Sequence, residues 1–228
     1  MLRLLVVAQL AAGLAGLRLQ CNSRGLVLRC TCPGGASTRG REPLSALLNP
    51  ELSAMAFYSE RVGQVVVAGC GTLDLLLDLD QLDSRATDLT DLSFQDMASV
   101  VVAWAGRARP RLRLVFTDIA VVTVTGSLRH PAARIEMFFR QLGPAGRDSS
   151  RVTFRDADMQ ADIRLLNFLN VAHLAVLGSS FNSVAAVDIH SKDLAKQTEC
   201  HSGPGKVGIS DNRRFSSLFS EKVKSDRR

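Results

Sequence analysis

The residues best suited to chemistry form a Gly-Ser-Ser-Phe turn at positions 178–181, between two apolar segments. Residues 173–178 form a short apolar run that predicts a buried strand, and residues 181–189 have the pattern of a helix. The first turn of a helix offers free backbone N–H groups and a positive dipole end, and these bind phosphate or diphosphate. The same turn also fits a simple helix N-cap without a ligand, so both interpretations stand.

The elements that would position this turn alternate along the chain. Apolar, β-branched runs predict strands, and apolar residues at helical spacing predict helices between them. Strands are expected at 64–70, 99–105, 111–116, 119–125, 151–156 and 173–178, and helices at 72–83, 131–143, 158–172 and 181–189, with a further helical pattern at 43–57 that Pro50 interrupts. The alternation predicts a Rossmann-like α/β fold, a mainly parallel sheet with helices on both faces.

The composition allows one packed domain with flanking segments. Of 228 residues, 46% are hydrophobic and 22% charged, which excludes wholesale disorder. We expect a loop-rich segment at 19–60, the α/β domain at 61–195 and a basic, disordered tail at 196–228. Residues 1–18 are read either as a signal peptide or membrane anchor, or as the first buried strand. The first alternative implies the secretory pathway or Golgi, and the second the cytoplasm.

Charge and cysteine usage exclude several classes of site. The net charge is +6, but aromatics make up only 5% of the residues, which disfavours a surface that stacks nucleic-acid bases. Five cysteines leave at least one unpaired within the chain. Neither the cysteines nor the four histidines show a metal-ligand spacing, so no metal is expected.

The segment DIRLLNFLNVAHLAVLGSSFNSVAAV resembles the C-terminal motif of fucosyltransferase-like glycosyltransferases, which use nucleotide-sugars. Asp162 stands at the acidic position that opens the motif, and Gly178 begins its small-Ser-Ser turn. The resemblance implies part of a two-domain GT-B fold with two Rossmann-like domains. The substrate-binding residues that it implies, with Arg107 as a cation for the phosphates, are Arg107, Asp162, Gly178, Ser179, Ser180 and Phe181.

The implied activity is transfer of a sugar from a GDP-linked donor to a hydroxyl of a glycan or protein. No further cofactor is implied. The catalytic residue stays unassigned, because the four candidate bases are equally compatible with solvated surface positions: Asp118, Glu136, Asp156 and Asp158. Residues 106–110 are Gly-Arg-Ala-Arg-Pro, where the family has a basic His-x-Arg-Arg-Gly-Asp motif. Because that motif is missing, a non-catalytic relative of the family is an alternative.

A second alternative is an S-adenosylmethionine-dependent methyltransferase. The strand at 64–70 leads into a Gly-Cys-Gly-Thr turn at 69–72, which resembles the first motif of that class. Because the third glycine is absent, an ordinary strand-to-helix turn explains the same residues.

Overall fold

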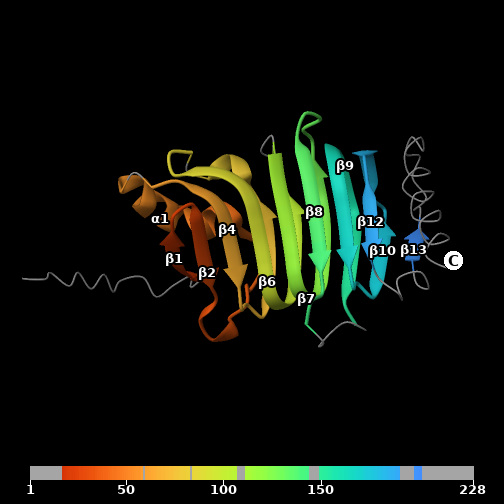
Figure 1. Ribbon diagram of the computed structural model, residues 1–228, viewed down its shortest axis with the longest axis horizontal. Helices are drawn as coiled ribbons and strands as arrows, with labels where there is room; N and C mark the ends of the chain where they lie inside the picture. The colour runs from red at the N-terminus through yellow and green to blue at the C-terminus, as the bar shows by residue number, and fades with distance from the viewer. Residues whose placement is uncertain are drawn as a thin grey trace, which may run out of the picture.

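The computed structural model of the chain is a parallel β-solenoid of about five turns with one α-helix (Figure 1). The structure describes residues 17–58, 60–82, 84–106, 111–143, 149–190 and 198–201. The predicted Rossmann-like α/β fold is wrong, and so is the GT-B architecture, because successive strands wind around one core and, within these ranges, no layer of helices covers a sheet. Most of the predicted signal segment and tail, and Arg107, lie outside the described residues.

Thirteen strands and one α-helix make up the described fold. The strands are β1 Gln20–Arg24, β2 Val27–Thr31, β3 Glu42–Pro43, β4 Val62–Ala68, β5 Thr72–Leu77, β6 Thr87–Trp104, β7 Arg111–Leu128, β8 Arg134–Arg140, β9 Arg151–Leu169, β10 His173–Leu177, β11 Ser180–Val184, β12 Val187–His190 and β13 Thr198–His201. The helix is α1 Leu44–Phe57, and two 3-10 turns are η1 Pro33–Gly35 and η2 Leu79–Gln81. Among the described strands, only β1 and β2 pair antiparallel.

The long strands bend at corners and so contribute to more than one side of the solenoid. The first lateral sheet contains β2, β4, 87–95 of β6, 111–117 of β7, β8, 162–169 of β9, and β12. The second lateral sheet contains β5, 97–104 of β6, 119–126 of β7, 151–155 of β9, β10 and β13. A short third sheet joins the end of β7, the middle of β9 and β11.

Residues with left-handed backbone conformation make the corner between the first two sheets. Asp96, Asp118 and Asn170 have φ of 54°, 53° and 55° there. Asp and Asn are the non-glycine residues that adopt this conformation most readily. Asp118 also accepts the backbone N–H groups of Leu142 and Gly143, each at 2.7 Å, so its carboxylate ties the next turn of the chain to the corner.

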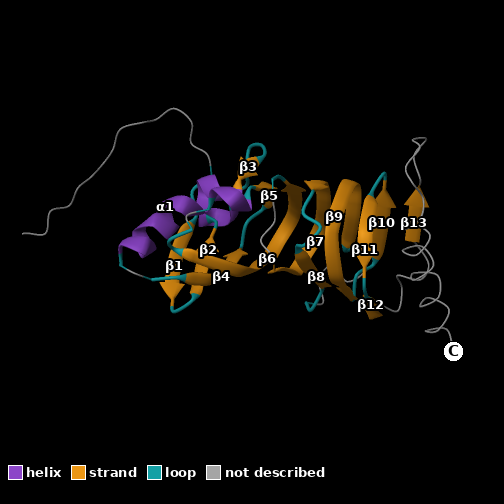
Figure 2. Cartoon of the chain, turned by 90° about the horizontal axis from the view of Figure 1, so that it is seen from above, coloured by secondary structure: helices purple, strands orange, loops and turns teal. Residues whose placement is uncertain are grey.

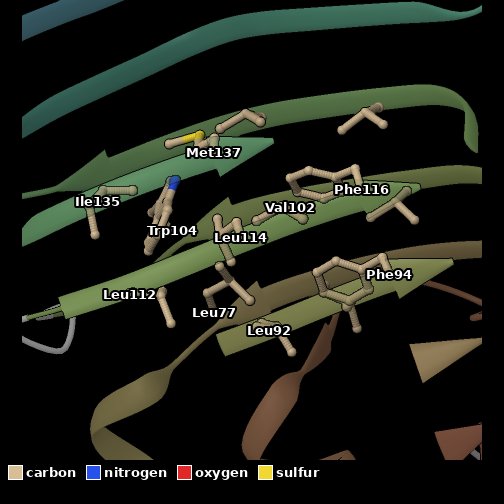
Figure 3. Packing of buried hydrophobic residues seen from close by; sticks show 14 of the residues in the cluster. Leu77, Leu92, Phe94, Val102, Trp104, Leu112, Leu114, Phe116, Ile135 and Met137 are labelled. Carbon is tan, nitrogen blue, oxygen red and sulfur yellow. The ribbon is translucent and has the colours of Figure 1, made fainter. Parts of the chain in front are cut away.

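The core is a stack of inward-facing side chains, one from each turn. Phe94, Phe116, Phe139 and Phe168 occupy aligned positions, with ring centroids 5.4, 5.1 and 5.0 Å apart and nearly parallel planes. Figure 3 shows part of this core, with Phe94 and Phe116 on neighbouring strands. Most aromatic residues of the described chain therefore lie inside the solenoid.

The predicted helices at 72–83, 131–143, 158–172 and 181–189 are wrong, because β5, β8, β9, β11 and β12 occupy these segments. In β9 the pairing with β8 shifts by one residue between Ile163 and Leu165. The inward-facing, fully buried side chains of Ile163 and Leu166 are consequently three residues apart instead of two. A β-bulge therefore produced the spacing that indicated a helix.

The N-terminal end of the solenoid is closed by elements from the segment expected to be loop-rich. The β1–β2 hairpin adds to β4, and α1 packs Leu44, Leu48 and Leu52 against the core (Figure 2). The helical pattern at 43–57 is thus confirmed, with Pro50 inside the helix. Disulfides join Cys21 to Cys30 and Cys32 to Cys70. The first links β1 to β2, and the second links the segment after β2 to the turn between β4 and β5.

Among the described residues, no helix is both long and apolar enough to cross a bilayer.

Candidate functional site: an arginine-bearing sheet face

The predicted diphosphate turn is a corner of the solenoid at which Ser179 and Phe181 are buried and Gly178 is exposed. The hydroxyl of Ser179 donates to the carbonyl of Leu177 at 3.1 Å and accepts the N–H of Ala157 at 3.0 Å. Gly178 has a φ of 58°, and a Cβ there would lie 2.6 Å from a carboxylate oxygen of Asp156. Both residues are therefore explained by packing of one turn on the next.

The residues after this corner form β11, so no helix N-terminus follows it. The hydroxyl of Ser180 donates to Asp158 at 2.9 Å, and Phe181 is buried with its ring edge-on to Phe154 at 5.4 Å. The prediction of a helix start that would bind a diphosphate is wrong, because its N–H groups and dipole are absent here. The glycosyltransferase activity itself stays a hypothesis, without that physical support.

Asp162 lies in β9 and forms an ion pair with Arg164 at 2.7 Å. Ser183 of β11 is its neighbour in the sheet, so Asp162 does lie near the predicted turn. Its carboxylate is nevertheless engaged by a cation from its own strand. Arg107, the predicted phosphate partner, lies outside the described residues.

The alternative glycine turn at 69–72 is also structural. Cys70 is bonded to Cys32, and Thr72 begins β5 instead of a helix. A Cβ on Gly71 would lie 2.6 Å from the Ser37 hydroxyl and 2.9 Å from the carbonyl of Gly35. The backbone of this turn is therefore packed against the chain itself, where a cofactor would have to approach.

The candidate base Asp158 is poorly suited to accept a proton. Its pKa is lowered, first by the hydrogen bond from Gln160, with smaller contributions from the hydroxyls of Ser180 and Ser127 and the charge of Arg129, against an opposing effect of partial burial. Of the other candidates, Asp118 is the corner carboxylate described above, Asp156 lies exposed at the next corner, and Glu136 lies on the outside of β8.

A cationic surface lies on the outside of the first lateral sheet. Alternation along β7 directs Leu112 and Leu114 into the core and Arg111 and Arg113 outward. On the next strand, Arg134 lies directly opposite Arg111. Both side chains are exposed, and neither side chain has an ion-pair or hydrogen-bond partner in the described part of the chain; Asp162, the neighbour of Arg134 on β9, pairs with Arg164 instead.

An aromatic ring supports the two other arginines of this surface. Phe138 points outward from β8, yet it is only 7% exposed. The guanidinium carbons of Arg113 and Arg140 lie 4.5 and 4.8 Å from the centre of its ring. Stacking on a ring holds a guanidinium in place while its N–H groups, which lie in its plane, can still reach a ligand. Arg113 has only a long ion pair, 4.0 Å, with Asp91.

We call this surface, made of Arg111, Arg113, Arg134, Phe138 and Arg140, the arginine face. The alternating Arg111 and Arg113 are visible in the sequence, but their register against Arg134 and Arg140 is not. Every Lys/Arg-type cation of the described residues is an arginine, because the five lysines lie outside the described ranges: Lys192, Lys196, Lys206, Lys222 and Lys224. Its planar fork of donors matches sulfate, phosphate and carboxylate groups better than an ammonium does.

One small pocket lies in the described part of the chain. A pocket at the corner between the first two sheets is lined by core residues with Arg140, Gln141 and Ser150, and its volume is about 10 Å³. That accommodates a water molecule and no nucleotide-sugar. No group of three or more potential metal ligands gathers within the described ranges.

Comparison with known proteins finds no matching family model, no matching curated protein and no matching solved structure.

Proposed function

We propose that this protein is a secreted or otherwise extracytoplasmic binding protein, whose arginine face recognises an extended glycan bearing sulfate or carboxylate groups. The observation that carries this proposal is the pair Arg111 and Arg134. They are exposed, opposite each other on adjacent strands and free of any carboxylate partner among the described residues. Two unpaired guanidinium groups side by side repel each other, and an anion between them removes that repulsion.

The shape of the surface favours a polymer over a small molecule. Adjacent strands lie about 4.8 Å apart, so Arg111 and Arg134 form a pair of neighbouring cations along the solenoid axis, and Asp162 follows them on β9. Arg113 and Arg140, both stacked on Phe138, add two cations on the same two strands, beside the carboxylate of Glu136, which lies opposite Arg113. An open sheet face contacts an extended chain at several points, whereas a small anion would gain little of this contact.

The two disulfides support a glycan as the ligand instead of a nucleic acid. Disulfides persist in oxidising compartments such as the secretory pathway and the extracellular space. Anionic polymers in those compartments are chiefly glycans with sulfate or uronate groups. The cysteine pairs Cys21–Cys30 and Cys32–Cys70 therefore support both the proposed location and the class of ligand.

The test compares dextran sulfate with uncharged dextran by calorimetry on the full chain. We expect binding of dextran sulfate alone, and the affinity should fall as salt rises. Replacing both Arg111→Ala and Arg134→Ala should weaken binding roughly ten- to a hundredfold, because each charged hydrogen bond contributes about 1.5–3 kcal/mol before losses elsewhere. Both side chains are exposed, so the fold should be unaffected.

The matched control is Arg155→Ala, which removes an exposed arginine from the second lateral sheet and should leave the affinity unchanged. Equal losses from Arg155→Ala and from the double variant would show that only net charge matters, which contradicts the proposal. Binding of GDP that is weakened by Ser179→Ala and Ser180→Ala would instead support the glycosyltransferase hypothesis.

A further inference from the structure

Large apolar side chains are exposed together at one end of the solenoid. Five large apolar residues of the described chain are exposed, and three of them lie at the N-terminal end: Leu26, Phe57 and Tyr58. Phe57 is 83% exposed and Tyr58 72%, and their rings pack edge-on at 5.4 Å. These values are high for aromatic residues, which normally bury most of their area.

Hydrogen bonds join the β1–β2 hairpin to the segment after α1, where the hydroxyl of Ser23 donates to Glu60 at 3.3 Å, and to the start of β4. Leu26 forms the turn of the β1–β2 hairpin, and its carbonyl accepts the N–H groups of Gly63 and Gln64 at the start of β4. Phe57 and Tyr58 end α1, only a few residues before β4. Figure 2 shows the end of α1 at the extreme of the long axis, beside β1 and the beginning of β4. We call Leu26, Phe57 and Tyr58 the apolar tip.

We propose that the apolar tip inserts into the surface of a lipid bilayer that contains anionic lipids. Phenylalanine, tyrosine and leucine are the residues that interfacial anchors place at the boundary between headgroups and acyl chains. Exposed apolar groups gathered at one end mark a contact surface. A membrane accepts a small protruding tip, whereas a stable protein interface needs a broad one.

One feature beside the tip favours lipid over a protein partner. Arg24 of the same hairpin is exposed and has no ion-pair partner among the described residues, so it is available to an anionic headgroup. The inference does not depend on the ligand of the arginine face.

Tyrosine occurs once in the chain and tryptophan once, which makes a direct test simple. The full chain carrying Tyr58→Trp is mixed with vesicles of phosphatidylcholine and phosphatidylglycerol, with and without brominated acyl chains. The native Trp104 is 4% exposed inside the solenoid and should not be quenched. The introduced indole should shift to shorter emission wavelengths and be quenched by bromine.

The control is Leu142→Trp, at another exposed apolar position that lies at a corner of the solenoid wall. Its indole should be unquenched under the same conditions. Adding Leu26→Ser and Phe57→Ser to the Tyr58→Trp chain should lower partition into vesicles roughly tenfold or more, as expected for the loss of two buried apolar side chains.

Two results would overturn the inference. One is quenching that is absent at position 58, or equal at positions 58 and 142. The other is self-association without lipid, measured by sedimentation, that Phe57→Ser abolishes, since the tip would then contact a second copy of the chain.

Discussion

At the scale of single residues, polar side chains in this protein mostly stabilise the connection between turns of the solenoid. Asp158 in β9 accepts hydrogen bonds from Ser180 of β11 and from Gln160, and approaches Ser127 of β7 at 3.3 Å. Its carboxylate thereby joins three successive strands of the third sheet. Such a group stabilises the fold in its ionised form.

This role predicts a dependence of stability on pH. The pKa of Asp158 in the folded chain lies below its ordinary value of 3.8. The stabilisation is therefore present above that ordinary value and is lost as the pH falls through the lower, folded-state pKa. Asp158→Asn should make the acid side of the stability curve shallower, as measured by urea unfolding from about pH 2 to about pH 6.

The control is Asp96→Asn, an exposed corner carboxylate without a side-chain hydrogen bond in the described structure. It should leave the acid side of the curve nearly as it is. If Asp158→Asn changes the curve no more than Asp96→Asn does, the hydrogen bonds to Asp158 do not stabilise its ionised form.

At the scale of elements, each strand contributes to stability only when it is stacked on its neighbours. The strands of the first sheet alternate inward apolar and outward polar residues, but one strand alone buries nothing. The ring of Phe116 in β7 is buried between the rings of Phe94 in β6 and Phe139 in β8. The aligned phenylalanines therefore link the stability of each turn to that of the next, as in other repeat folds.

Phe116→Ala should accordingly destabilise the fold by about 3–5 kcal/mol, because it leaves a cavity in the middle of the stack. Phe138→Ala, on the outside of the adjacent strand, should cost clearly less, since its ring packs mainly against Arg113 and Arg140. Chemical denaturation of the two variants measures the difference. Similar losses would mean that the inward stack has no special weight in stability.

At the scale of the whole molecule, the N-terminal end is closed and covalently reinforced. The hairpin, α1 and both disulfides all lie at this end (Figure 1). The Cys32–Cys70 bond spans 38 residues of chain and includes α1, so it links the cap to the second turn. An intact cap protects the edge of β2 from pairing with other chains.

Loss of this bond should therefore lower stability substantially. For a loop of this length, the entropy of the unfolded chain predicts a loss of about 4 kcal/mol on Cys32→Ala with Cys70→Ala. In a chain of this size, that corresponds to a fall of roughly 10 °C in Tm, measured by calorimetry. Reductant should then lower the Tm of the variant less than that of the unmodified chain. An unchanged Tm in the variant would show that the cap is held by packing alone.

The sequence predicted several elements correctly, but the arrangement predicted for them was wrong. The apolar runs at 64–70, 99–105 and 173–178 lie in β4, β6 and β10, and the helix at 43–57 is α1. Short, β-branched runs report strand structure by themselves, whatever the fold. The bulge in β9 and the outward Phe138 in β8 disturbed the two-residue alternation, and a helical interpretation of both segments followed.

The amino-acid sequence by itself determined where five of the thirteen described strands lie in whole or in part, β4, β6, β7, β9 and β10, and where α1 lies. Only the tertiary structure decided which strands are neighbours, which cysteines pair, and that Arg111 lies opposite Arg134. The physical reason is that alternation within a strand depends on local residues, whereas register depends on the core shared by turns that lie far apart in the chain.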